Sequence, residues 1–114
     1  MKLLLTSNGF SNKTIANALT DLAGKPFSQL KLVFIPTAAN IEDEDKQWLI
    51  EDLENCRKLG FKEIDIVDID ALPAEVCIKR IEKADVIMFG GGDCFYLRDW
   101  VWKTGLKELL PKLL

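Results

Sequence analysis

The chain has 114 residues, of which 48% are apolar and 29% charged, and its formal net charge is −3. This size and composition are typical of one globular domain, so we treat residues 1–114 as a single domain. The mildly acidic balance and scattered basic residues favour neither a nucleic-acid partner nor an anionic membrane, and no apolar run is long enough to span a bilayer.

The inventory of side chains limits the chemistry further. The sequence contains no histidine and three cysteines, Cys56, Cys77 and Cys94. Without histidine, neither a Ser–His nor a Cys–His catalytic pair nor a His-based zinc site can form within these residues. The cysteines lie far apart, without the spacing of metal ligands or of a redox pair. We therefore expect no metal or other cofactor, and a reducing cytoplasm as the setting.

The first part of the chain alternates apolar runs with a helical pattern. Residues 2–6 are interpreted as a first buried strand rather than as a targeting segment. The helix that follows is expected to be capped by Ser11 or Asn12 and to end at Gly24. Residues 31–36 then predict a second buried strand. This strand–helix–strand order is the repeating unit of a parallel sheet.

The next part of the chain repeats the alternation. A second helix is expected to open on the acidic run Glu42–Asp45, whose charges suit the positive end of the helix dipole, and to end at Gly60. Residues 61–69 alternate apolar and polar side chains, which predicts a third strand near an edge of the sheet. Pro73 suits the first turn of a third helix, and residues 85–89 predict a fourth strand.

Two helical segments follow the fourth strand. Leu97, Trp100 and Val101 give the first an apolar face, and Gly105 separates it from the second. The βαβαβαβα order predicts an α/β fold with a doubly wound, flavodoxin-like parallel sheet. Because four such strands leave helix surface uncovered, we expect a sheet truncated after four strands and a domain incomplete at its C-terminal end. The exposed sheet edge or the C-terminal helices would then favour a homo-oligomer.

Ligands of parallel sheets bind at the carboxyl ends of the strands. Small or polar segments follow the predicted strands there, at 7–9, 37–40 and 90–94, so this end of the sheet is expected to be open enough for a ligand. The most informative segment is Gly90-Gly91-Gly92-Asp93. Glycines let the backbone approach a ligand closely and direct its N–H groups at an anion or a developing oxyanion. The alternative is a tight strand-to-helix turn with Asp93 as N-cap.

Other motifs are excluded or weak. A dinucleotide fingerprint needs a small residue where Phe95 stands, and no Gly-Lys-Ser/Thr of a P-loop is present. Cys94 is interpreted as a small packing residue rather than a nucleophile, because the chain holds no base for it. The acidic run Glu42–Asp45 is interpreted as a solvated helix start rather than a cation site.

The segments LLLTSNG, VFIPTAAN, LGFKEIDIVDI, ADVIMFGGGDCFYL and KTGLKELL follow one another as in the aspartyl dipeptidase (dipeptidase E) and cyanophycinase family of serine peptidases. The chain resembles the N-terminal half of that family, which implies a fold like that of the class I glutamine amidotransferases. The resemblance implies that Gly91 and Gly92 form part of the oxyanion hole and that Gly90 and Asp93 lie beside the substrate. Many members have asparagine where Asp93 stands, and an ionised aspartate accepts but cannot donate a hydrogen bond.

The family's nucleophile is a serine in a Gly-x-Ser-Ala-Gly elbow on the next strand, and its histidine follows later. Neither is in this sequence. The resemblance therefore implies that the complete enzyme hydrolyses small peptides through an acyl-enzyme, and that these 114 residues alone are inactive. The alternative is a small flavodoxin-like module that binds phosphate or another anion, or that self-assembles, without catalysis.

Overall fold

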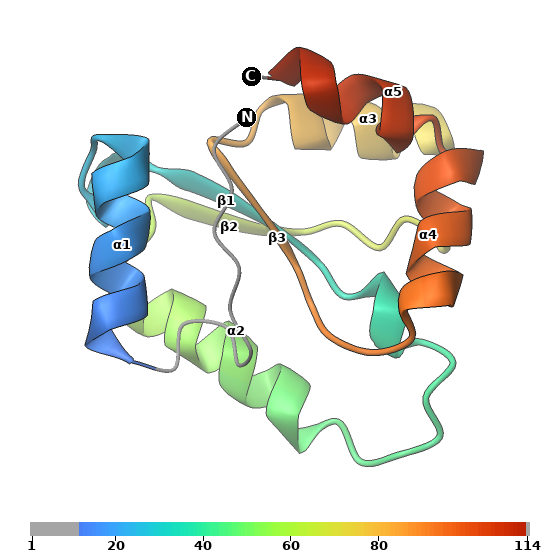
Figure 1. The fold of residues 1–114 in the computed structure, drawn as a ribbon, viewed down its shortest axis with the longest axis horizontal. Coiled ribbons are helices and arrows are strands. Elements are labelled where there is room, and N and C mark those ends of the chain that lie inside the picture. The colour runs from blue at the N-terminus through green and yellow to red at the C-terminus, as the bar shows by residue number, and fades with distance from the viewer. Residues whose placement is uncertain (1–11, 114) are drawn as a thin grey trace.

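The structure is a computed structural model that describes residues 12–113 of the chain. A three-stranded parallel sheet forms the centre of this part (Figure 1). Its strands are β1 (Lys31–Ile35), β2 (Glu63–Ile66) and β3 (Val86–Phe89), in the order β2-β1-β3. The predicted strand at residues 2–6 and the segment 7–9 lie outside the described residues.

Side chains alternate along β1, so apolar side chains lie on both faces of the sheet, and helices cover both. Leu32 and Phe34 point into one apolar cluster, whereas Val33 and Ile35 point into the other. Figure 1 shows α1 (Lys13–Ala23) and α2 (Gln47–Leu59) on one side of the sheet, and α3 (Ala74–Glu82), α4 (Cys94–Lys103) and α5 (Leu106–Leu109) on the other. The doubly wound α/β fold predicted from the alternation is confirmed.

The predicted helix ends are confirmed where the signal is local. The Asn12 side chain caps α1, with its Oδ1 atom accepting from the N–H of Ile15 at 2.9 Å. Gly24 and Gly60 end α1 and α2 in left-handed backbone, with φ of 70° and 82°. Short 3-10 turns η1 (Phe27–Gln29), η2 (Thr37–Ala39) and η3 (Leu110–Leu113) complete the connections.

The predicted start of the second helix is wrong. α2 begins at Gln47, after the acidic run Glu42–Asp45. The Lys46 ammonium donates to the backbone carbonyls of Glu42 and Glu44, so these residues form a turn around a cation. The Asp45 carboxylate then accepts from the N–H of Gln47 at 2.9 Å and helps to start the helix.

The third strand is shorter than the predicted range 61–69. Within the described sheet β2 is an outer strand, as predicted, but it ends at Ile66. Val67 still donates from its N–H to the Phe34 carbonyl at 2.9 Å, and then the chain leaves the ladder. Ile69 is fully buried beyond the strand, and its N–H donates to the Thr37 hydroxyl at 3.0 Å.

Among the described residues, no helix is both long and apolar enough to cross a membrane.

Candidate functional site

The segment Gly90–Asp93, here called the glycine loop, joins β3 to α4 and lies beside η2. At its start, the N–H of Gly90 donates to the carbonyl oxygen of Ile35 at 3.0 Å. At its end, the N–H of Asp93 donates to the carbonyl oxygen of Ala38 at 2.8 Å. Gly90 is buried, whereas Gly91 and Gly92 are exposed between these two anchors. The loop therefore presents a short stretch of accessible backbone on a fixed base.

The fold itself requires glycine at one of the three positions and favours it at a second. Gly92 has a φ of 140°, and a Cβ atom there would lie 2.2 Å from the carbonyl oxygen of Ala38. At Gly90, a Cβ atom would lie 3.1 Å from the Phe34 ring, which is a tight contact. At Gly91 it would lie 3.7 Å from the Trp48 ring, an ordinary distance. Packing therefore explains Gly92, and in part Gly90, but it leaves Gly91 unexplained.

The loop's N–H groups are not equivalent as donors. Those of Gly90 and Asp93 are already bonded to backbone carbonyls. Within residues 12–113, the N–H groups of Gly91 and Gly92 have no acceptor. Two adjacent backbone donors with no acceptor among these residues form an arrangement that suits a developing negative charge. Of the residues predicted for this site, Gly91 and Gly92 are the ones that retain free backbone donors.

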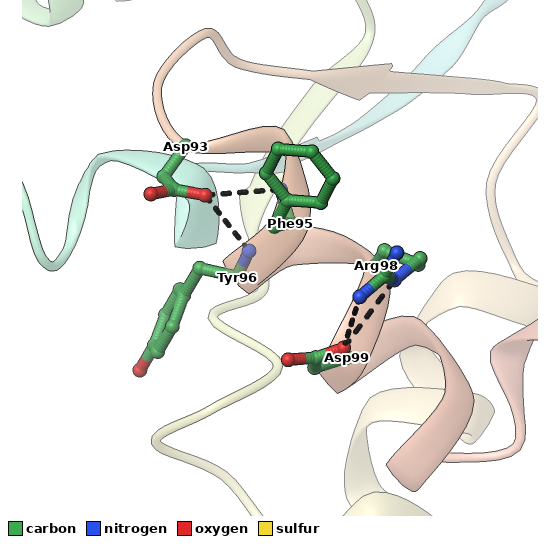
Figure 2. Close-up of polar contacts among 5 residues, drawn as sticks. All are labelled: Asp93, Phe95, Tyr96, Arg98 and Asp99. Carbon is green, nitrogen blue, oxygen red and sulfur yellow. Dashed lines mark hydrogen bonds and ion pairs between the residues drawn. The ribbon is translucent and has the colours of Figure 1, made fainter.

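Asp93 acts as the N-cap of α4. Its Oδ1 atom accepts from the backbone N–H groups of Phe95 at 2.9 Å and Tyr96 at 3.0 Å, as the dashed lines in Figure 2 show. The simpler of the two interpretations of Asp93 is therefore confirmed, and its contact with substrate stays a prediction. Because Oδ1 serves the helix, the carboxylate is held against the positive end of the α4 dipole.

A polar network at the carboxyl end of the sheet joins the segments that follow β1, β2 and β3. The Thr37 hydroxyl donates to Asp68 at 2.7 Å. The side-chain nitrogen of Asn40 lies 2.9–3.0 Å from carboxylate oxygens of both Asp68 and Asp70. The Tyr96 hydroxyl donates to Asp70. The segments after β1 and β2 are thereby connected to the first turns of α4.

The charges in this network are stabilised by their hydrogen bonds. Burial acts to raise the pKa of the Asp70 carboxyl, but hydrogen bonds from Tyr96 and Asn40 outweigh it and hold the pKa below its usual range. The hydrogen bond to Asp70 in turn raises the pKa of the Tyr96 phenol. At neutral pH the pair is therefore a phenol donating to a carboxylate, a charge-assisted hydrogen bond.

The structure brings together two of the three segments predicted to meet at this end of the sheet. Residues 37–40 and the glycine loop are in contact through Ala38, and 7–9 lies outside the described residues. Thr37, Ala38 and Ala39 are buried and support the loop, whereas Asn40 is exposed. An end of the sheet that is open enough for a ligand stays a prediction. The sequence analysis missed Asp68, Asp70 and Tyr96; two acids directly after a predicted strand were the available signal.

The cysteines do not add a nucleophile to this site. Burial raises the pKa of Cys56 to about 12 and also raises that of Cys77, so both stay protonated at neutral pH. Cys94 is exposed on the first turn of α4, so its prediction as a packing residue is wrong. Within residues 12–113, no group of His, Cys, Asp and Glu side chains could hold a metal ion.

A shallow cavity of about 110 Å³ lies at the opposite end of the strands, away from the glycine loop. The ion pair of Arg80 with Asp65 lies in its wall, with Arg80 Nε 2.9 Å from Asp65 Oδ2. The hydrogen bond from Arg80 holds the pKa of Asp65 below its usual range. Lys31 and Glu63, which also line the cavity, lie 3.9 Å apart as a second ion pair.

Comparison with known proteins identifies the family. The sequence profile of Peptidase family S51 matches residues 3–114. The chain belongs to this family. Its predicted resemblance to the dipeptidase E group is thereby confirmed. An S51 assignment also places the glycine loop, the most distinctive motif of the sequence, in a peptidase family rather than in a nucleotide-binding one.

Two relatives support the assignment. A curated protein of Pasteurella multocida (strain Pm70), described as an uncharacterized peptidase, is 24% identical over 112 residues, which are 98% of this chain and 52% of the relative. A crystal structure from Listeria monocytogenes EGD-e, of a protein named "Putative Peptidase E Protein", superposes with a TM-score of 0.74 at 25% identity. That match covers 93% of this chain and 50% of the other. The S51 chain thus spans about half the length of these relatives.

Proposed function

We propose that this chain supplies the oxyanion-hole loop of a serine-type peptidase that acts on small peptides. The observation that carries the proposal is the pair of N–H groups at the exposed residues Gly91 and Gly92, which have no acceptor among residues 12–113, in a chain of Peptidase family S51. Their position after a parallel strand and before a helix is where the substrates of α/β enzymes bind. Hydrolysis of dipeptides in particular, and a cytoplasmic location, remain part of the proposal.

The chemistry assigned to the loop is stabilisation of charge. A serine hydroxyl attacks the scissile carbonyl carbon, its proton passes to a general base, and the carbonyl π electrons move to the oxygen. The N–H groups of Gly91 and Gly92 then donate to this oxyanion. Because Gly90 and Asp93 anchor the loop to the segment after β1, the donors need little reorganisation when charge develops. Loss of one such donor typically lowers kcat by about 10²–10³-fold.

The nucleophile and base are proposed to lie outside these 114 residues. The sequence has no histidine and no Gly-x-Ser-Ala-Gly elbow, so the chain alone is expected to be inactive. The first test is the sequence of the source gene beyond codon 114. A serine elbow with a histidine after it is the expected result, and a natural stop codon would contradict the proposal. Peptide hydrolysis by the purified 114-residue chain would also overturn it.

The rival function, an anion-binding module, is disfavoured by Asp93. Its carboxylate already occupies the N-terminus of α4, where a phosphate would otherwise bind. A phosphate beside it would meet a like charge. Titration of the chain with inorganic phosphate or flavin mononucleotide, followed by tryptophan fluorescence, is expected to show no saturable response. A saturable response would favour the module.

We also propose self-association through the outer face of α4. Phe95 and Trp102 are 71% and 53% exposed, and the Arg98 guanidinium lies over both rings at 5.2 and 5.3 Å. Exposed aromatic side chains in one stripe favour contact with another protein surface. The predicted association through the sheet edge is kept as the alternative.

A further inference from the structure

The position of α4 relative to the sheet requires an explanation, because the glycine loop ends where α4 begins. No residue of α4 is fully buried. Leu97, Trp100 and Val101 pack only partly against the core cluster on that face of the sheet. Trp100 and Val101 lie beyond the first turn, so Leu97 is the one of the three that packs near the end of the helix that carries the loop. Apolar packing alone therefore does not hold the loop's donors in one place.

We infer that Tyr96 and Asp70 are positioning residues for the glycine loop. Tyr96 lies in the first turn of α4, and its side chain points away from the ring of Phe95 (Figure 2). Its hydroxyl donates to Asp70, in the segment after β2. The strand order is β2-β1-β3, so this contact joins α4, which follows β3, to the segment that follows β2, across the central strand β1. The inference concerns the loop's geometry, and its catalytic consequence rests on the proposed function.

The hydrogen bonds form a closed circuit around the loop. The Asp93 N–H binds the Ala38 carbonyl, and Asp93 is joined to Tyr96 through the helix cap. Tyr96 binds Asp70, and Asp70 binds Asn40, which lies two residues beyond Ala38 in the chain. Removing the Tyr96–Asp70 link leaves the loop held only by its two backbone hydrogen bonds, from Gly90 to Ile35 and from Asp93 to Ala38. Such a circuit restrains the direction of the Gly91 and Gly92 N–H groups more than either contact alone.

A comparable polar contact at the other end of the sheet provides the matched control. Arg80 and Asp65 form a hydrogen-bonded ion pair between α3 and β2, and neither residue touches the glycine loop in the described structure. Loss of that pair is expected to lower global stability without loosening the loop. Loss of the Tyr96–Asp70 contact is expected to loosen the loop by more than the change in global stability explains.

The test is ¹⁵N relaxation and amide exchange on the 114-residue chain, with Tyr96→Phe, Asp70→Ala, their combination, and Asp65→Asn as control. In the parent chain, the order parameters of the Gly91 and Gly92 amides are expected to be about 0.85. They should fall toward about 0.6 in Tyr96→Phe and Asp70→Ala. Exchange of the Asp93 amide should rise about fivefold or more in these variants after correction for global unfolding. The double variant should be no worse than either single one.

Two results would overturn the inference. One is a Tyr96→Phe chain whose Gly91 and Gly92 order parameters and Asp93 exchange match those of Asp65→Asn after the same correction. The other is a parent chain whose Gly91 and Gly92 amides are already as mobile as a free loop. Because no catalysis is measured, failure here is distinguishable from failure of the peptidase proposal. Urea unfolding of each variant supplies the correction, and Tyr96→Phe removes only one oxygen atom.

Discussion

Replacement of Gly92 by alanine tests whether the loop is fitted against η2 as closely as the structure shows. The new Cβ atom would lie 2.2 Å from the Ala38 carbonyl oxygen, whereas a close carbon–oxygen contact is about 3.3 Å. The alanine would also need a φ of 140°, which residues with a side chain rarely adopt. Backbone strain of this kind costs about 1–3 kcal/mol. Moving Ala38 away would also break its hydrogen bond with the Asp93 N–H, for about 1 kcal/mol more.

We therefore expect Gly92→Ala to lower the free energy of unfolding by about 2–4 kcal/mol. Urea unfolding measures this change as a lower midpoint with an unchanged slope. Gly91→Ala is the matched control, because its Cβ atom would lie 3.7 Å from the Trp48 ring. Its free energy of unfolding should stay within about 0.5 kcal/mol of the parent value. Equal midpoints for the two variants would refute the close fit of Gly92 against Ala38.

Three further predictions concern other parts of the molecule. The hydrogen bond from Arg80 lowers the pKa of Asp65. The parent chain should therefore be more stable than Asp65→Asn above about pH 4, and this advantage should shrink as the pH falls through the lowered pKa. A difference in unfolding free energy that stays constant with pH would contradict this. Asn12→Ala should cost about 1 kcal/mol in urea unfolding, since it removes the α1 cap; an unchanged midpoint would show that the cap contributes nothing. Trp102→Glu should shift sedimentation toward the monomer, whereas Ile50→Glu, at a similar exposure of 50% but on α2 across the sheet, should not. Equal profiles would count against association through α4.

The regular elements could be predicted because their signals are local. Asn12 caps the first helix through its own side chain, and Gly24 and Gly60 end helices through their own backbone. The start of α2 could not be predicted in this way. The acidic run was expected to favour the helix dipole, but the Lys46 ammonium finds closer acceptors in the carbonyls of Glu42 and Glu44. That competition depends on how the turn folds, which periodicity does not describe.

The position of the candidate site could be predicted from the sequence, but the residues that hold the glycine loop in place could not. Three glycines after an apolar run marked the loop, yet the need for glycine at Gly92 arises from the Ala38 carbonyl on another strand's loop. The contact of Tyr96 with Asp70 likewise depends on the strand order β2-β1-β3. Strand order is a property of the assembled sheet and leaves no trace in the spacing of apolar residues. The identity of the supporting residues therefore required the structure.

We propose that the N–H groups of Gly91 and Gly92 receive the oxyanion. The most direct measurement uses the peptidase that contains this chain together with its serine, labelled with ¹⁵N and titrated with a peptide aldehyde. The aldehyde adds the serine oxygen to its carbonyl carbon and so places a tetrahedral oxyanion in the site. We expect large downfield shifts of the Gly91 and Gly92 amide protons, with the amide proton of the buried Gly90 little changed. Inhibition by the aldehyde without any shift at Gly91 and Gly92 would contradict it.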